Sequence, residues 1–98
     1  MIKVVLPAAL RRLAKLDGNV EIEMDPPFTQ RNLLSALEQK YPMLRGTTRD
    51  QQSQKRRAYV RFYACGEDLS DESPDAELPP AVVAGKEPYL IVGAMSGG

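Results

Sequence analysis

The sequence contains no histidine and a single cysteine, Cys65. Hydrolytic sites that pair serine or cysteine with histidine, and zinc sites built from the usual ligands, are therefore excluded. The glycine-rich and Walker patterns that hold phosphate groups are also missing. A lone thiol has no partner for an intrachain disulfide, which favours a reducing compartment, so we expect a cytoplasmic protein. Neither a bound cofactor nor a metal is expected.

Membrane and nucleic-acid signals are missing as well. No apolar run approaches the ~20 residues of a membrane span, and the chain does not start like a signal peptide. Thirteen basic residues balance thirteen acidic ones, which removes the strong positive field of a dedicated nucleic-acid binder. Residues 1–61 carry twelve basic and six acidic side chains, whereas residues 62–98 carry one and seven. This asymmetry either orients a docking partner or is a dipole without function.

The 98 residues, 43% apolar and 27% charged, fit one globular domain. Alternating or β-branched runs predict the strands of a sheet, and the linker between the first two strands suits antiparallel pairing. Side chains expected to point inward are Val4, Leu6, Val20, Ile22, Val60, Phe62 and Ile91. The predicted strands cover residues 2–6, 20–23, 58–64 and 89–92, with a short pairing at 67–69.

Two helical segments are predicted. Residues 8–16 form a short turn that Gly18 ends, with Leu10, Leu13 and Ala14 on its apolar face. The main helix covers residues 30–41, between an N-cap at Thr29 and the break at Pro42. Its apolar stripe is Leu33, Leu34, Leu37 and Tyr41, and its solvated side chains are Arg31, Glu38 and Lys40.

The remaining segments are interpreted as connections. Residues 46–57 lack apolar side chains and are expected to form a mobile surface loop, with Lys55, Arg56 and Arg57 solvated. Residues 70–85 are expected to be irregular, and Cys65 to be a half-buried bystander in a turn with Gly66. The acidic side chains that follow lack EF-hand spacing, so a solvated loop is preferred over a cation site; they are Glu67, Asp68, Asp71, Glu72, Asp75 and Glu77.

The element order is ββαββ, an α+β roll in which one main helix covers a mixed sheet of four or five strands. Residues 1–93 form the domain, and residues 94–98 form a flexible tail that ends in Gly97-Gly98. In extended form the tail reaches roughly 16–18 Å. A stem without side chains fits a tunnel that any Cβ would block.

In this order the sequence resembles the MoaD/ThiS family of ubiquitin-like, β-grasp sulfur carriers. The matching pieces are Lys-Val-Val-Leu-Pro near the start, Glu-Gln-Lys-Tyr-Pro-Met-Leu over residues 38–44, Val-Arg-Phe-Tyr-Ala-Cys over residues 60–65 followed by Gly-Glu-Asp-Leu, and the closing Ile-Val-Gly-Ala-Met-Ser-Gly-Gly. The sequence departs from the family at Cys65, where asparagine is common, at Gly93, where proline is common, and at residues 84–87, where Asp-Gly-Asp is usual.

The resemblance implies a carrier that is not itself an enzyme. An E1-like adenylating enzyme activates the carboxylate of Gly98 with ATP, and a sulfur donor such as a cysteine desulfurase supplies the sulfur of a thiocarboxylate. A sulfur-accepting synthase subunit then takes that sulfur. Gly97 matters because the partner's channel is narrow at that point. The pathway stays open between molybdopterin, thiamine and cysteine biosynthesis, although the long loop 46–57 looks more like the cysteine-pathway carrier.

Docking requires a surface beside the tail. Apolar side chains on a solvated sheet face are candidates for an interface core, unless residues 70–85 cover them. Two alternative functions remain: a ubiquitin-like modifier conjugated through Gly98, and a non-catalytic interaction module whose diglycine is incidental. The partner-binding candidates are Tyr59, Arg61, Tyr63, Leu90, Val92 and Met95, with Val5 on the same face.

Overall fold

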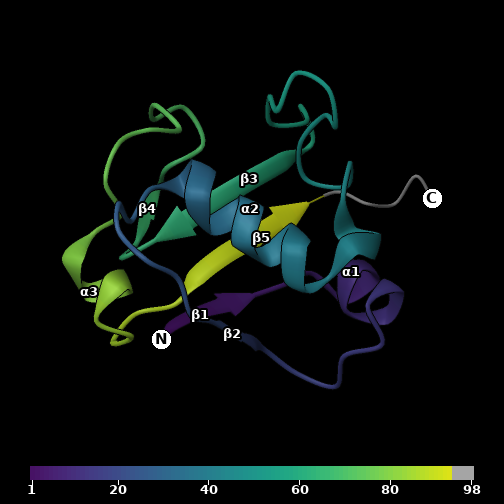
Figure 1. The fold of residues 1–98 in the computed structure, drawn as a ribbon, viewed down its shortest axis with the longest axis horizontal. Coiled ribbons are helices and arrows are strands. Elements are labelled where there is room, and N and C mark those ends of the chain that lie inside the picture. Colours follow the sequence, from purple (N-terminus) through teal and green to yellow (C-terminus); the bar gives the residue numbers. More distant parts are fainter. Residues whose placement is uncertain (94–98) are drawn as a thin grey trace.

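One mixed sheet organises the chain, and the computed structural model describes residues 1–93 of it. Strand β5 lies at the centre of the sheet, whose order is β2-β1-β5-β3-β4 (Figure 1). β1 and β5 run parallel, and the other neighbouring strands are antiparallel. The elements are β1 (Ile2–Val5), α1 (Ala8–Leu13), β2 (Val20–Ile22), α2 (Gln30–Lys40), the 3-10 helix η1 (Pro42–Leu44), β3 (Val60–Ala64), β4 (Glu67–Asp68), α3 (Pro80–Val83) and β5 (Tyr89–Gly93).

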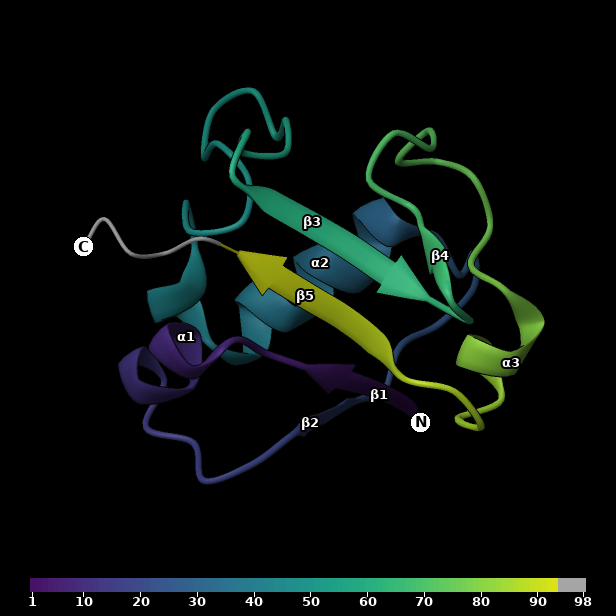
Figure 2. The same ribbon diagram turned by 180° about the vertical axis from the view of Figure 1, so that it is seen from behind.

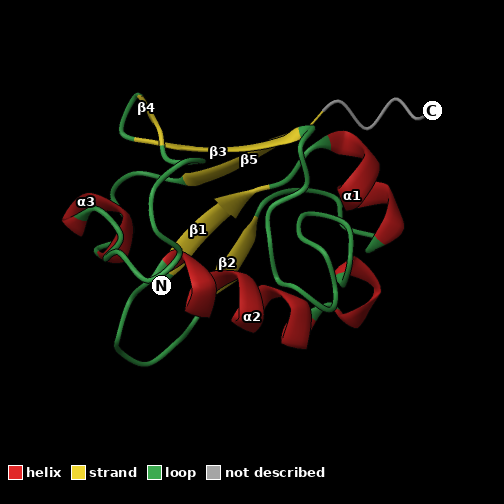
Figure 3. Cartoon of the chain, turned by 90° about the horizontal axis from the view of Figure 1, so that it is seen from above, coloured by secondary structure: helices red, strands yellow, loops and turns green. Residues whose placement is uncertain are grey.

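The core lies between one face of this sheet and α2 (Figure 3). At its centre the Tyr89 ring stacks on Phe62 with 5.7 Å between centroids. The Tyr89 hydroxyl donates to the side-chain oxygen of Gln30, and burial raises the pKa of this phenol. The expected α+β roll is confirmed, and so is every predicted inward side chain: Val4, Leu6, Val20, Ile22, Val60, Phe62 and Ile91 are buried.

Helix α2 begins and ends as its sequence predicts. The Thr29 hydroxyl accepts a 3.1 Å hydrogen bond from the backbone N–H of Asn32, which is the N-cap interaction. The chain leaves the α-helical conformation at Tyr41 and continues into η1, which starts at Pro42. The stripe of Leu33, Leu34 and Leu37 is buried, and Tyr41 is partly buried against the core.

The loop over residues 46–57 corrects two expectations. Arg49 is buried and donates from Nε to Glu38 Oε2 at 2.9 Å, so Glu38 is a buried partner and not a solvated residue. Arg56 and Arg57 are not simply solvated either. Arg56 donates to the Val60 carbonyl at 2.8 Å, and Arg57 donates to the Gly46 carbonyl at 2.7 Å. A loop without apolar side chains is therefore held to the domain by Arg49 and Arg56, while Arg57 closes the loop on its own first residue.

Two other segments differ from their predictions. Residues 70–85 are not irregular throughout, because they include α3 and bury Leu78 and Val82 in the core. In α1 the side chains of Leu10 and Ala14 are buried, but Leu13 is exposed to solvent, so its predicted inward position was wrong. Among residues 1–93, no helix has the length and apolar character needed to cross a membrane.

The end of α1 is not made by Gly18. Lys15, with φ 58°, takes the left-handed conformation that ends the helix. Past it, the N–H of Leu16 returns to the Arg11 carbonyl at 2.8 Å. Gly18 has no positive φ, so its predicted role as the terminating residue was wrong.

Candidate functional site

The sheet face opposite α2 brings most of the predicted partner-binding residues together (Figure 2). Because side chains alternate along a strand, burial of Tyr89 and Ile91 turns Leu90 and Val92 to this open face. Leu90 lies opposite Tyr63 on β3 and opposite Val5 on β1. These three side chains therefore form one row across the centre of the sheet.

A second row lies closer to the end of β5. Val92 is opposite Arg61, and Val60, the residue after Tyr59, is opposite Gly93. The side chains of Val92 and Tyr59 are 49% and 47% exposed. This exposure excludes the alternative in which residues 70–85 cover both of them. The open face therefore presents an apolar surface next to the last described residue.

Charges border this surface on the side of β4. Arg61 lies 3.5 Å from a carboxylate oxygen of Asp68 and 3.8 Å from one of Asp71. Hydrogen bonds from the hydroxyl and then the backbone N–H of Ser70 hold the pKa of Asp68 below its ordinary value, and the positive charges of Arg61 and Arg56 add to this effect. Asp68 is therefore an anionic neighbour of Arg61 at the edge of the apolar face.

The topology also determines where β5 ends. Since β5 runs parallel to β1 and antiparallel to β3, its last residue lies beside the start of β3 and near the passage from β1 into α1. The chain continues from Gly93 at that end of the sheet. The predicted carrier residues Gly97 and Gly98, and the predicted contact Met95, lie outside the described residues.

Cys65 and the acidic residues that follow it were the other two candidate sites in the sequence. Cys65 is exposed, not half-buried, in a two-residue turn in which it and Gly66 have φ values of 53° and 77°. Within residues 1–93, no three histidine, cysteine, aspartate or glutamate side chains are grouped so that they could hold a metal. Of the acidic cluster, Asp75 instead forms a 2.7 Å ion pair with Arg31.

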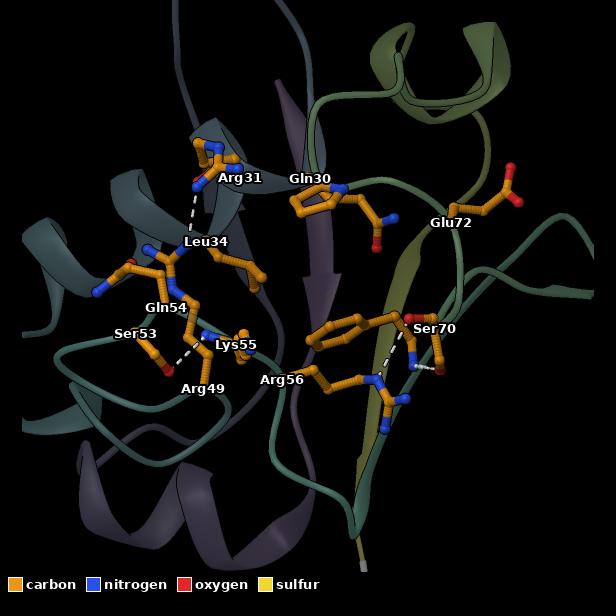
Figure 4. Close-up of a pocket in the computed structure, with 12 residues that line it drawn as sticks. Gln30, Arg31, Leu34, Arg49, Ser53, Gln54, Lys55, Arg56, Ser70 and Glu72 are labelled. Atoms are coloured by element: carbon orange, nitrogen blue, oxygen red, sulfur yellow. Dashed lines mark hydrogen bonds between the residues drawn. The ribbon is translucent and has the colours of Figure 1, made fainter.

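A cavity of about 440 Å³ lies on the other side of the molecule, between α2, the loop over residues 46–57 and the segment after β4 (Figure 4). Its walls include Gln30 and Leu34 from α2 and Arg56 from the loop. The guanidinium groups around it already donate to carboxylates and backbone carbonyls, which leaves them few donors for a ligand. We therefore assign Arg49 and Arg56 to holding the loop, and Arg31 to holding the segment after β4 through Asp75.

The sequence did not indicate two exposed apolar residues outside the sheet face. Leu13 of α1 was expected in the core, and Met43 of η1 was not singled out. Both are 47% exposed. The exposure of Leu13 could have been predicted from the length of α1. A helix this short buries only a narrow stripe, and Leu10 with Ala14 at the C-terminal cap already forms it. For Met43 the signal is its position beside Leu44 in a single 3-10 turn, where only Leu44 is buried.

No protein-family model and no curated protein matches this chain. Among solved structures it is similar to CysO in the Amycolatopsis orientalis BexX/CysO complex, with a TM-score of 0.75, 18% identity and 100% of both chains covered. It is also similar to SAMP1 from Haloferax volcanii, with a TM-score of 0.73, 18% identity and coverage of 98% and 97%. A second H. volcanii small archaeal modifier protein 1 structure gives a TM-score of 0.69 at 16% identity over 91% of each chain. At such identities the likeness is one of fold, and the chain has the ubiquitin-like β-grasp fold that its resemblance to MoaD/ThiS proteins predicted.

Proposed function

We propose that this protein is a ubiquitin-like sulfur carrier that works through the carboxylate of Gly98. The observation that carries the proposal is the likeness to CysO over 100% of both chains, together with the Gly97-Gly98 pair that follows β5 in the sequence. A central strand that ends beside an exposed apolar face supports the same function, because a partner bound to that face meets the segment after Gly93.

The proposed chemistry has two steps, both carried out by a partner enzyme. A carboxylate oxygen of Gly98 attacks the α-phosphorus of ATP, forming an acyl adenylate and releasing pyrophosphate. Hydrosulfide then attacks the acyl carbon, so that a C–S bond forms while the bond to the AMP oxygen breaks. The carrier leaves with a thiocarboxylate in place of the carboxylate. The protein is thus a substrate of the enzyme, and ATP is used without being bound by the carrier.

Two groups of residues have proposed roles in this cycle. Gly97 passes through a narrow part of the partner's channel, where a Cβ would add bulk and restrict φ. The open sheet face supplies the docking surface, with Val92 and Tyr59 at its exposed centre and Arg61 along its border. Leu90 and Tyr63 complete this surface, and Met95, which precedes Gly97 and Gly98 in the sequence, is a further proposed contact.

Intact-mass measurement tests the proposal. The protein is incubated with an E1-like enzyme from the same genome, ATP and sulfide, and we expect the gain in mass of one oxygen exchanged for sulfur. A variant without Gly98 is the control and is expected to gain nothing. An unchanged mass of the full chain with every E1-like enzyme of that genome would refute the proposal.

The likeness to proteins named as archaeal modifiers favours a second candidate function. As a modifier, the chain would use the same acyl adenylate, but a lysine amine of a target protein would attack in place of hydrosulfide. Peptides from cells that carry a Gly-Gly remnant of this chain on lysine would support it. Our first proposal for the sulfur acceptor remains a synthase subunit of molybdopterin, thiamine or cysteine biosynthesis.

A further inference from the structure

The end of the sheet at which β5 finishes also carries two short helices. Figures 1 and 3 show α1 beside this end, and α1 is in contact with η1. Leu10 of α1, Ala14 at its C-terminal cap and Leu44 of η1 are buried. The two helices thus form a flank of the molecule that adjoins the end of β5 but is not part of the open sheet face.

The exposed apolar residues concentrate at this end. Apart from Met1, the large hydrophobic side chains most exposed within residues 1–93 are Leu13, Met43, Tyr59 and Val92. Tyr59 and Val92 belong to the sheet face described above. Leu13 and Met43 lie on the flank, where about half of each residue is open to solvent. An isolated domain gains no stability from such exposure.

Three basic residues lie close in the sequence to the two flank residues. Arg12 and Lys15 adjoin Leu13, and Arg45 follows Met43 by two residues; all three are exposed. The ion pairs found among residues 1–93 involve Arg31, Arg49, Arg56 and Arg61, and none of these three. The acidic side chains after β3 lie toward the other end of the sheet, where β4 and α3 are found. Those acidic side chains that form ion pairs do so with Arg31, Arg56 and Arg61 and not with the three flank cations.

We infer that this flank, made of Leu13 and Met43 with Arg12, Lys15 and Arg45, is a second docking surface that binds an acidic, apolar-centred surface of the adenylating enzyme. Uncompensated cations around an apolar pair are complementary to carboxylates around an apolar patch. The position beside the end of β5 makes the flank continuous with the sheet face, so both contact the enzyme that receives Gly98. This inference rests on the proposed function and adds the chemistry of the partner surface.

Kinetics of the pyrophosphate exchange step test the charged part of the flank. The probe is the E1-like enzyme of the same genome, with the full chain as its substrate. We expect Arg12→Glu and Arg45→Glu each to raise the KM for the carrier about tenfold and to leave kcat unchanged, because rim charges act on association. Lys86→Glu is the matched control, since Lys86 is an exposed cation between α3 and β5. We expect no change of KM for this variant.

The apolar part of the flank has its own variants. Leu13→Ser and Met43→Ser are expected to raise KM by a similar factor, while the urea midpoint of each stays at the wild-type value because both side chains are exposed. Raising the salt concentration is expected to raise KM more steeply for the wild type than for Arg12→Glu.

If the wild type is adenylated and all four flank variants keep its KM, the second docking surface is wrong and the carrier function stands. If the wild type is never adenylated, both are wrong.

Discussion

Arg49 and Glu38 form a buried ion pair that fastens the loop over residues 46–57 to α2. The Nε to Oε2 distance is 2.9 Å, and the two side chains are 4% and 11% exposed. Arg49 also donates to the Ser35 hydroxyl at 2.9 Å. This loop is therefore attached to α2 by a charged contact, whereas the other elements of the core are joined by apolar packing.

Removing one partner of this pair is expected to be costly. Glu38→Ala leaves the Arg49 charge buried without its carboxylate, and we expect a loss of about 3–5 kcal/mol in the free energy of unfolding. Replacing both residues, as in Glu38→Leu with Arg49→Met, is expected to cost less than the single change, because no charge is stranded. Urea unfolding followed by circular dichroism measures both. A single-variant loss below about 1 kcal/mol would contradict the assignment.

The turn between β3 and β4 offers a stabilising change. Cys65 has a φ of 53° ahead of Gly66 at 77°, which is the backbone of a two-residue hairpin that prefers Asn-Gly. An ordinary L-residue in the left-handed region costs about 1 kcal/mol, and asparagine tolerates it better. Cys65→Asn is therefore expected to raise the free energy of unfolding by about 0.5–1 kcal/mol. Cys65→Ser is the control of similar shape, and an equal gain there would show that the turn geometry is not the cause.

Acid is expected to lower the free energy of unfolding through three aspartate carboxylates. The pKa values of Asp50, Asp68 and Asp75 are lowered from 3.8, by backbone hydrogen bonds from Ser53, by the Ser70 hydroxyl and by Arg31 respectively. A lowered folded pKa means that the stabilisation is present above 3.8 and is lost as the pH falls through the folded values. The urea midpoint is expected to fall between about pH 4 and pH 2. The urea midpoint of Asp50→Asn is expected to fall less over this pH range than that of the wild type. An identical fall would show that Asp50 does not contribute to the acid sensitivity.

The sheet face can be tested separately from the flank. Val92→Asp places a carboxylate on an exposed apolar position, so we expect the free energy of unfolding to change by less than about 0.5 kcal/mol. The KM for the adenylating enzyme is expected to rise severalfold, since a charged side chain replaces an apolar one in the proposed contact. Gln39→Glu adds the same charge on the exposed side of α2 and is expected to act like the wild type. Equal KM values for the two variants would argue against docking through Val92.

The strands and their inward side chains could be predicted from the sequence because side chains alternate between the two faces of a strand. Val60, Phe62 and Ala64 alternate with polar or aromatic neighbours, and a half-buried strand requires that alternation. The cap at Thr29 was equally local, since its hydroxyl reaches a backbone N–H three residues later. The row formed by Leu90 and Tyr63 followed once the faces were assigned, although pairing across the sheet was needed to align them.

The sequence could not reveal interactions between distant polar residues. Glu38 and Arg49 lie eleven positions apart, and each is of a type that is usually solvated, so nothing in the periodicity marks them as buried. Helix α3 was missed because three prolines in residues 70–85 suggested an irregular segment. Pro80 was in fact the signal, since proline fits the first turn of a helix. Leu13 was misplaced because a six-residue helix is too short to show which apolar residues it buries.

The central position of β5 has a consequence for biosynthesis. Strands β1 and β3 have no contact with each other in the sheet until residues 89–93 enter between them. A ribosome-bound chain that lacks this last strand therefore holds an open, unfinished sheet. Under the proposed function, an adenylating enzyme that recognises the finished sheet would act only on copies in which β5 has been synthesised and has taken its place.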